Sequence, residues 1–143
     1  MLAEPVGCAD VTVGIVTHNR TAYLKQVVHS LELQNTCKDF KVLIYDVGAC
    51  SADMQSSDCD PIVLDKLKNQ LGAAGIDTTI VVSKVPDQYI SGARNELIAL
   101  VTTKYLLFFD DDDIAHAYMV SGFFLYDPII LPILYTMIYL QMP

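Results

Sequence analysis

Four consecutive aspartates, Asp110 to Asp113, directly follow the apolar segment 105–109. The segment is rich in leucine and aromatic residues, which predicts a buried strand. Adjacent ionised carboxylates repel one another, and the repulsion grows at the end of a buried strand, where the dielectric constant is low. The chain has 17 acidic residues, and gathering four of them here requires either a nearby cation or the protonation of some carboxyl groups.

Two of these aspartates, Asp110 and Asp112, occupy alternate positions, so their side chains can turn to the same side of an extended segment. Mg²⁺ and Mn²⁺ prefer one or two carboxylates, with phosphate oxygens and water as the remaining ligands. The pattern therefore predicts that Asp110 and Asp112 bind Mn²⁺ or Mg²⁺ together with a phosphorylated ligand. The alternative is a solvated acidic turn, which the apolar strand before it disfavours.

Further polar residues with suitable chemistry follow the other expected strands or begin a helix. His18 and Arg20 follow the first strand, where a ring can stack on a base and a guanidinium can bind phosphate, although plain surface roles fit equally well. Asp46 ends the second strand and can accept a hydrogen bond from a base or a ribose, or cap the turn at Gly48. Arg94, at the start of a helix, is the best cation for a diphosphate; a helix-surface ion pair is its alternative.

The sequence contains no glycine-rich phosphate loop, since neither G-x-G-x-x-G nor G-x-x-x-x-G-K-[ST] occurs. A bound nucleotide must therefore be held by a metal and by side chains. The net charge is −8 and lysine and arginine form no cluster, so nucleic acid is not an expected partner. The length of 143 residues and the hydrophobic fraction of 52% fit one domain with a well-filled core.

Expected strands and helices alternate along the chain. Each strand is an apolar run that ends in polar residues, and the helices carry apolar residues at helical spacing. This alternation is typical of right-handed βαβ units. It predicts an α/β fold, a three-layer α/β/α sandwich with a mainly parallel sheet. The expected strands are residues 11–16, 40–45, 78–82 and 105–109, and the expected helices are residues 21–31, 62–71 and 91–101.

The four cysteines, Cys8, Cys37, Cys50 and Cys59, include no Cys-x-x-Cys pair and have no histidine at zinc-ligand spacing. We expect free thiols in a reducing compartment, because the chain is not a small disulfide scaffold. The N-terminal residues 1–10 lack the basic start and apolar core of a signal peptide. The expected location is therefore the cytoplasm or the cytoplasmic face of a membrane.

Residues 117–143 contain no lysine or arginine, and Asp127 is their only charged residue. A membrane-spanning helix needs about 20 apolar residues, but Pro128 and Pro132 interrupt the run. A transmembrane helix is therefore the less favoured interpretation. We expect a hydrophobic tail over residues 120–143 that is buried, lies on a membrane surface, or results from a truncated reading frame.

Five motifs in the same order resemble the nucleotide-sugar-binding half of family 2 glycosyltransferases, inverting enzymes with the Rossmann-like A-type fold. The resemblance covers residues 11–119. The motifs are the first strand and its exit, Val11 to Arg20; the first-helix residues Tyr23, Leu24, Lys25, Ser30 and Leu31, with Gln34 beyond; the second strand, Lys41 to Asp46; the helix start Ala93-Arg94-Asn95; and Phe108 to Asp113.

The resemblance implies three segments: an N-terminal extension over residues 1–10, a nucleotide-sugar-binding domain over residues 11–119, and the tail over residues 120–143. It also implies that Asp46 contacts the base and that the acidic run contains the metal-binding D-x-D segment. The residues that the resemblance assigns to the nucleotide sugar are Thr17, His18, Arg20, Asp46, Arg94 and Asp111.

Three departures from the family pattern bear on function. His18 stands where the family usually has a tyrosine that stacks on uracil, and Val47 stands where aspartate or asparagine is more common. The family's acceptor-binding half and its general base follow the metal motif, whereas this chain stops at Pro143. We therefore expect the general base to lie outside this sequence.

The sequence thus predicts the donor-binding part of an inverting glycosyltransferase. With Mn²⁺ or Mg²⁺, such an enzyme transfers a sugar from a nucleoside-diphosphate sugar to an acceptor hydroxyl, here of unknown identity. One alternative is a non-catalytic nucleotide-sugar-binding fragment that lacks the acceptor half. The other is a metal-dependent phosphohydrolase, which two aspartates at alternate positions would suit, although no lysine or threonine motif completing such a site is evident.

Overall fold

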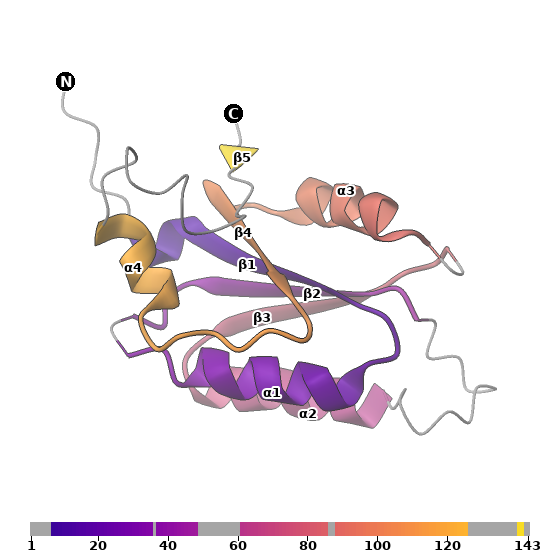
Figure 1. The fold of residues 1–143 in the computed structure, drawn as a ribbon, viewed down its shortest axis with the longest axis horizontal. Coiled ribbons are helices and arrows are strands. Elements are labelled where there is room, and N and C mark those ends of the chain that lie inside the picture. The colour runs from indigo at the N-terminus through magenta and orange to yellow at the C-terminus, as the bar shows by residue number, and fades with distance from the viewer. Residues whose placement is uncertain (1–6, 36, 49–60, 86–87, 126–139, 142–143) are drawn as a thin grey trace.

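The computed structural model describes residues 7–35, 37–48, 61–85, 88–125 and 140–141. Within these ranges the chain forms a sheet with helices packed against it (Figure 1). The strands are β1 (Val11–Thr17), β2 (Lys41–Asp46), β3 (Asp77–Val82), β4 (Tyr105–Asp110) and β5 (Leu140–Gln141). The helices are the 3₁₀ turn η1 (Cys8–Asp10), α1 (Thr21–Glu32), α2 (Pro61–Ala73), α3 (Ile90–Leu100) and α4 (Met119–Leu125).

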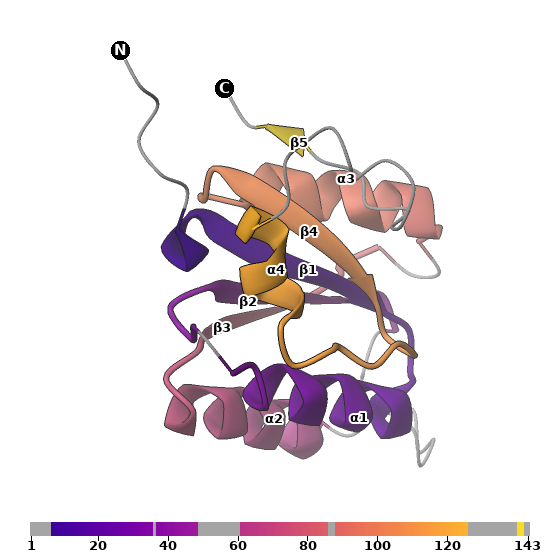
Figure 2. The same ribbon diagram turned by 60° about the vertical axis from the view of Figure 1, so that its left-hand side comes forward.

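The sheet has the strand order β3-β2-β1-β4-β5, in which the first four strands are parallel and β5 runs antiparallel to β4. Helices α1 and α2 lie on one face of the sheet and α3 lies on the other (Figures 1 and 2). The predicted three-layer α/β/α sandwich with a mainly parallel sheet is therefore confirmed.

The side chains of β1 alternate between two hydrophobic clusters, as a strand buried on both faces requires. Val13 and Ile15 belong to the cluster that includes α1 and α2. Gly14 faces the opposite side of the sheet, where an added Cβ would come 2.7 Å from Cδ2 of Leu97 and 2.8 Å from Cδ1 of Leu106. Glycine at this position therefore lets α3 pack closely against the centre of the sheet.

The strand register brings the last residues of the strands to one end of the sheet, which we call the carboxyl end. Thr17 pairs with Asp46, Asp46 pairs with Val82, and Val16 pairs with Asp110. The segments that follow β1, β2 and β4 therefore start side by side. This is the arrangement that the sequence predicts for the candidate site.

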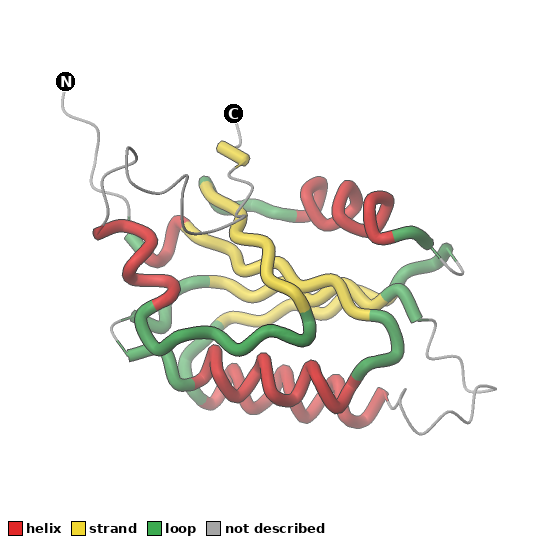
Figure 3. Tube along the Cα trace, viewed as in Figure 1, coloured by secondary structure: helices red, strands yellow, loops and turns green. Residues whose placement is uncertain are grey.

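The chain after β4 turns back along α1 as a loop and then enters α4 (Figure 3). The amide of Ala115 donates to Ser30 Oγ at 2.9 Å. The Gln34 side chain donates to the carbonyl of His116 at 2.7 Å and accepts from the amide of Val120 at 3.0 Å. These hydrogen bonds tie the segment that follows the acidic run to α1.

Cys8 and Cys37 form a disulfide, so the prediction that they are free thiols is wrong. Cys8 precedes β1 and Cys37 precedes β2, and these strands are parallel neighbours. Their starts therefore meet at the opposite end of the sheet, which we call the amino end, and the spacing of the cysteines along the chain does not reveal this. Cys50 and Cys59 lie outside the described residues.

Helix α4 begins at Met119, one residue before the predicted hydrophobic tail, and its Val120 is buried in the core. Residues 126–139, which contain Pro128 and Pro132, lie outside the described residues. Of the helices in the described ranges, none combines the length and the apolar character that crossing a membrane requires. The segment boundaries at residues 10 and 119, and the association of the tail with a membrane, remain predictions.

Candidate functional site

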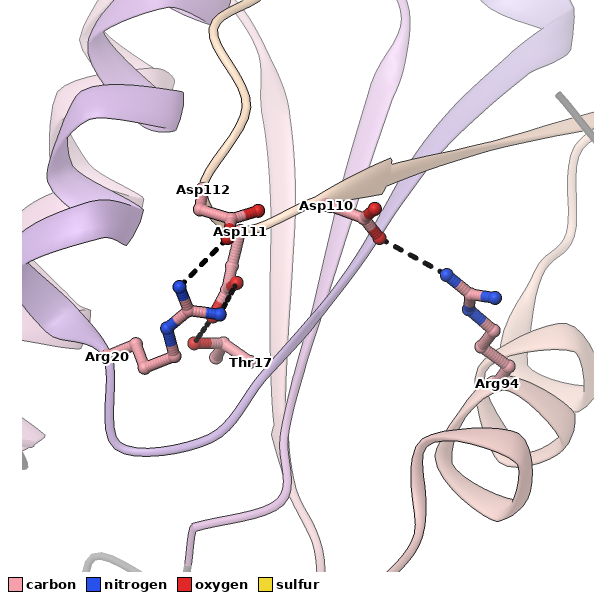
Figure 4. A network of polar contacts seen from close by, with 6 residues as sticks. All are labelled: Thr17, Arg20, Arg94, Asp110, Asp111 and Asp112. Atoms are coloured by element: carbon pink, nitrogen blue, oxygen red, sulfur yellow. Dashed lines mark hydrogen bonds and ion pairs between the residues drawn. The ribbon is translucent and has the colours of Figure 1, made fainter. Parts of the chain in front are cut away.

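The predicted site residues all lie in described parts of the chain, and the carboxyl end of the sheet brings them together. β1 ends at Thr17, β2 ends at Asp46 and β4 ends at Asp110, while Arg94 reaches the same place from α3. Figure 4 shows the network that results, in which three aspartates contact two arginines and a threonine.

Asp111 is the buried member of the acidic run, with 5% of its surface exposed. One carboxylate oxygen accepts from Thr17 Oγ1 at 2.8 Å and the other accepts from Arg20 Nη1 at 2.9 Å (Figure 4). Burial raises the pKa of Asp111, and the Thr17 hydrogen bond and the Arg20 charge oppose that rise. Asp111 thus joins the end of β4 to the exit of β1, and a direct contact with a nucleotide sugar stays a prediction.

Arg20 bridges Asp111 and its exposed neighbour Asp112. Its Nη2 atom donates to Oδ2 of Asp112 at 2.9 Å, and its guanidinium lies over the Tyr23 ring at 4.6 Å from the centroid. The hydrogen bond to Asp112 and the charge of Asp111 raise the pKa of Arg20. Arg20 is therefore a permanent positive charge held at the rim of the site.

Arg94 forms a second and more exposed ion pair. Its Nη2 atom donates to Oδ1 of Asp110 at 3.2 Å, and the two side chains are 35% and 59% exposed. The guanidinium lies 5.3 Å from the centroid of the Phe108 ring, on the same strand as Asp110. The helix-surface ion pair that the sequence left open for Arg94 is thus present, with a partner on β4.

The acidic run therefore has cations nearby, as its charge density requires, and in this structure they are arginines. Asp110 points toward Arg94 on one side, and Asp112 points toward Arg20 on the other (Figure 4). Among the described residues, the acidic run brings no three ligand atoms within 4.8 Å of one another. The group that meets this criterion is Cys8, Cys37 and Asp39, whose sulfurs form the disulfide. The assignment of a metal to Asp110 and Asp112 stays a prediction.

Asp46 lies beside this network at the end of β2 and is 3% exposed. Its Oδ1 atom accepts from the amide of Gly48 at 3.0 Å, which is the turn cap considered from sequence. Burial raises the pKa of Asp46 to about 6, against the Gly48 hydrogen bond and the charge of His18. A carboxylate has about four lone-pair sites, so capping the turn does not prevent Asp46 from accepting a hydrogen bond from a ligand as well.

Sequence reasoning missed the part that Asn19 plays between these elements. Asn19 has a positive φ of 53°, and its Oδ1 atom is buried without a hydrogen-bond partner. It packs against Gly48, where a Cβ would clash with the Asn19 side chain and come 2.8 Å from its backbone nitrogen. The signals in the sequence were an asparagine two residues after the end of β1 and a glycine two residues after Asp46.

Sequence reasoning also missed the aromatic supports of the two arginines. Tyr23 lies in the first turn of α1, three residues after Arg20, and Phe108 lies two residues before Asp110 on the same face of β4. The spacing of Phe108 could have been used to find its role, because residues two apart on a strand share a face. The position of Arg94 over that ring depends on the packing of α3.

Comparison with known proteins identifies a matching family and similar folds. The family model described as glycosyl transferase family 2 matches residues 12–124. No curated protein matches the chain. The crystal structure of Staphylococcus aureus TarS residues 1–349 is similar with a TM-score of 0.62 and 20% identity over 78% of this chain. A crystal structure of S. aureus TarS gives a TM-score of 0.53 and 23% identity over 73% of this chain.

The matched region is a small part of these relatives. The chain covers 30% of the TarS 1–349 structure and 17% of the other TarS structure. TarS 1–349 was also crystallised in complex with UDP-GlcNAc and with UDP, and both complexes match this chain with a TM-score of 0.62. At this level of identity the structural likeness shows a shared fold.

Proposed function

The chain belongs to glycosyl transferase family 2, and from this premise we propose that the carboxyl end of its sheet binds the nucleoside-diphosphate part of a sugar donor. The observation that carries the proposal is the meeting of Arg20 and Arg94 with three aspartates at the ends of parallel strands. Ligands of open α/β sheets bind at this end of the strands. The TarS complexes with UDP-GlcNAc and UDP support the same ligand class.

In the proposed complex, the residues divide into three groups by role. Asp46 accepts a hydrogen bond from the base, and His18, exposed beside it, stacks on the base or contacts the ribose. Arg20 and Arg94 bind the diphosphate, because a guanidinium presents a planar fork of donors that matches phosphate oxygens. Asp111 holds Arg20 in place through a partly buried hydrogen bond, and Thr17 holds Asp111 through a buried one.

The donor set at the acidic run fits a hard divalent cation. Asp110 and Asp112 are both exposed and offer carboxylate oxygens, the ligands that Mg²⁺ and Mn²⁺ prefer together with phosphate. When bound there with a nucleotide, Mn²⁺ or Mg²⁺ would supply Lewis-acid stabilisation of the charge on the departing diphosphate.

The proposed reaction is transfer with inversion at the anomeric carbon. An acceptor hydroxyl oxygen forms a bond to that carbon, the bond to the diphosphate breaks, and the diphosphate leaves with the electron pair. The arginines stabilise the negative charge that develops on the leaving group. The hydroxyl proton passes to a general base, a contribution of about 10²- to 10⁴-fold in rate, and we assign this role to no residue of the chain.

Binding of the donor without transfer is the second candidate, because the residues identified above all serve binding. Membership of the family favours either candidate over a metal-dependent phosphohydrolase. Measuring sugar release from a nucleotide sugar alongside binding distinguishes the two: heat of binding without turnover supports the binding module. Release of phosphate from simple phosphate esters, without nucleotide binding, would favour the phosphohydrolase.

The test of the proposed site is calorimetric titration with UDP and with GDP in the presence of Mn²⁺. Asp112→Asn is expected to abolish metal-dependent nucleotide binding and to leave the stability of the fold close to that of the wild type, because the fall in like-charge repulsion offsets the weakened, exposed ion pair with Arg20. Asp113→Asn is the matched control, since it removes the same charge from the next exposed position. Equal nucleotide affinity of the Asp112 variant and the wild type would contradict the metal assignment. If neither UDP nor GDP gives heat of binding, the proposed function is contradicted.

A further inference from the structure

We propose that Arg20 and Arg94 act as internal counter-ions that hold the predicted metal ligands apart until a diphosphate takes over the arginines. Metal and diphosphate would then bind together, each strengthening the other. The inference rests on the proposed function, and it adds a rule for how the site is loaded.

Each predicted metal ligand is paired with its own arginine in this structure. Asp110 contacts Arg94 at 3.2 Å and Asp112 contacts Arg20 at 2.9 Å. The two arginines come from different elements, the β1–α1 loop and α3, so they draw the carboxylates to opposite sides (Figure 4). Both aspartates are thus paired with a guanidinium on opposite sides of the acidic run, and Arg20 shares its charge between Asp112 and Asp111.

A divalent cation that binds alone meets two obstacles at this site. Mg²⁺ demands near-ideal octahedral geometry at short distances, so an aspartate turned toward an arginine must first be redirected. A guanidinium that remained beside the same carboxylate would also repel the incoming cation. Binding of the metal by itself is therefore expected to be weak.

A diphosphate removes both obstacles because it offers the arginines a new partner. The arginine side chains are partly exposed, at 41% for Arg20 and 35% for Arg94, so a ligand can reach them. Tyr23 and Phe108 lie under the two guanidinium groups and can support them in the same position. The arginines then exchange carboxylate for phosphate, and the aspartates become available to the metal.

The two arginines differ in how many of their carboxylate contacts can be replaced by phosphate. Nη1 of Arg20 is engaged by the buried Asp111, so only its Nη2 contact with Asp112 is free to change partner. Among the described residues, the carboxylate that Arg94 contacts is that of the exposed Asp110. Substitution of Arg94 therefore tests the counter-ion role without disturbing a buried carboxylate.

The experiment compares wild type with Arg94→Gln in three calorimetric titrations: Mn²⁺ alone, UDP alone, and UDP at saturating Mn²⁺. For the wild type, Mn²⁺ should raise the UDP affinity at least tenfold. For Arg94→Gln, the affinity for Mn²⁺ alone should rise about two- to fivefold, the size of one exposed ion pair. Its affinity for UDP without metal should fall. The enhancement of UDP binding by Mn²⁺ should also shrink, because Asp110 no longer has an arginine that the diphosphate must draw away. Since coupling between two ligands is reciprocal, UDP should enhance Mn²⁺ binding by the same smaller factor.

Lys41→Gln is the matched control, since it removes one positive charge from the start of β2, at the amino end of the sheet. It should leave all three affinities unchanged. Arg94→Lys keeps the charge but loses the fork of donors, so its Mn²⁺ affinity should stay near that of the wild type while its UDP affinity falls.

Two outcomes would overturn the inference: a wild type that binds UDP equally well with and without Mn²⁺, or an Arg94→Gln variant whose affinity for Mn²⁺ alone is unchanged or lower. Failure of the proposed function looks different. In that case UDP does not bind under either condition, while the Mn²⁺ titration of Arg94→Gln still decides whether the arginine competes with the metal.

Discussion

At the amino end of the sheet a disulfide and a hydroxyl–hydroxyl hydrogen bond join neighbouring segments, whereas at the carboxyl end charged contacts join them. At the amino end, the disulfide between Cys8 and Cys37 joins the segments before β1 and β2, and the hydroxyls of Thr12 and Thr103 hydrogen-bond at 2.6 Å. At the carboxyl end, the corresponding contact of β1 is the hydrogen bond from Thr17 to the buried carboxylate of Asp111.

This difference shows how one scaffold separates stability from binding. Neutral contacts need no ligand to be favourable, so the amino end can stabilise the fold at any stage of the proposed reaction. Buried and clustered carboxylates remain costly unless cations or donors meet them. The carboxyl end therefore favours ligands that bring or redistribute positive charge, and the predictions below test this separation.

The largest expected effect is on stability at the amino end. The disulfide links residues separated by 29 positions, and restricting a loop of that size in the unfolded chain contributes about 3–4 kcal/mol. Replacing both Cys8 and Cys37 with alanine should lower the free energy of unfolding in urea by this amount and leave UDP affinity unchanged. Reductant should destabilise the wild type similarly and leave the double variant unaffected. Loss of UDP binding by the folded double variant would break the separation between the two ends.

The next effect concerns Asp46 and its dependence on pH. Its pKa rises from 3.8 to about 6 on folding, so the folded state holds the proton more tightly and stability falls as pH rises through about 6. At about 1.4 kcal/mol per pKa unit, ionised Asp46 destabilises the fold by up to about 3 kcal/mol at pH 7. Asp46→Asn should therefore gain stability relative to the wild type at pH 7, and the gap should narrow toward pH 4.

Nucleotide affinity should change with pH in the opposite direction. The proposed contact to the base needs the ionised acceptor, so UDP binding by the wild type should weaken as pH falls below about 6, a value set by the raised pKa of Asp46. Asp46→Asn should bind UDP weakly at every pH. A stability difference between variant and wild type that does not change from pH 4 to pH 7 would contradict the role given to burial.

A smaller effect is expected where the exits of β1 and β2 touch. Gly48→Ala would place a Cβ 2.8 Å from the backbone nitrogen of Asn19, and overpacking of this kind costs about 1–3 kcal/mol. The variant should unfold at lower urea concentration and bind UDP more weakly. Gly72→Ala in α2 is the control, because nothing lies within 4 Å of its Cβ and alanine favours a helix. Equal stability of the two variants would mean that the contact between the exits is loose.

The smallest effect is a difference between the same substitution at the two ends of β1. Thr12 and Thr17 are 3% and 4% exposed, but Thr12 meets a hydroxyl and Thr17 meets a carboxylate. Hydrogen bonds to charged groups are worth about 1 kcal/mol more than neutral ones, so Thr17→Val should be destabilised by about that much more than Thr12→Val in urea. Only Thr17→Val should weaken UDP binding, since it releases Asp111. The reverse order of stability would contradict the charged character of the carboxyl end.

Much of the fold could be predicted because its signals are local. The apolar run before Asp110 and the run that ends at Asp46 became β4 and β2, since hydrophobic period and turn residues decide strands over short stretches. Parallel pairing then follows from the intervening helices. For the same reason, the positions of Asp46 and Asp110 at strand ends were predictable.

The contacts within the site could not be predicted in the same way. Arg20 and Asp111 are 91 positions apart, and Thr17 and Asp111 are 94 apart. No periodic pattern relates such residues, because they meet only once the strand register and the β1–α1 loop are both formed. The sequence therefore identified Asp111 as a candidate for ligand binding, and the structure adds that it is buried and hydrogen-bonded to the side chains of Thr17 and Arg20.

The sequence alone determines the alternation of strands and helices, the acidic residues where two strands end, and the arginines near the expected phosphate site. Each of these patterns lies within a single segment of the chain. The tertiary structure decided which arginine faces which aspartate, which carboxylates are buried, and which cysteines are joined. Those outcomes depend on side chains from different segments sharing a limited space at each end of the sheet, where burial and charge are set by neighbours that sequence distance does not reveal.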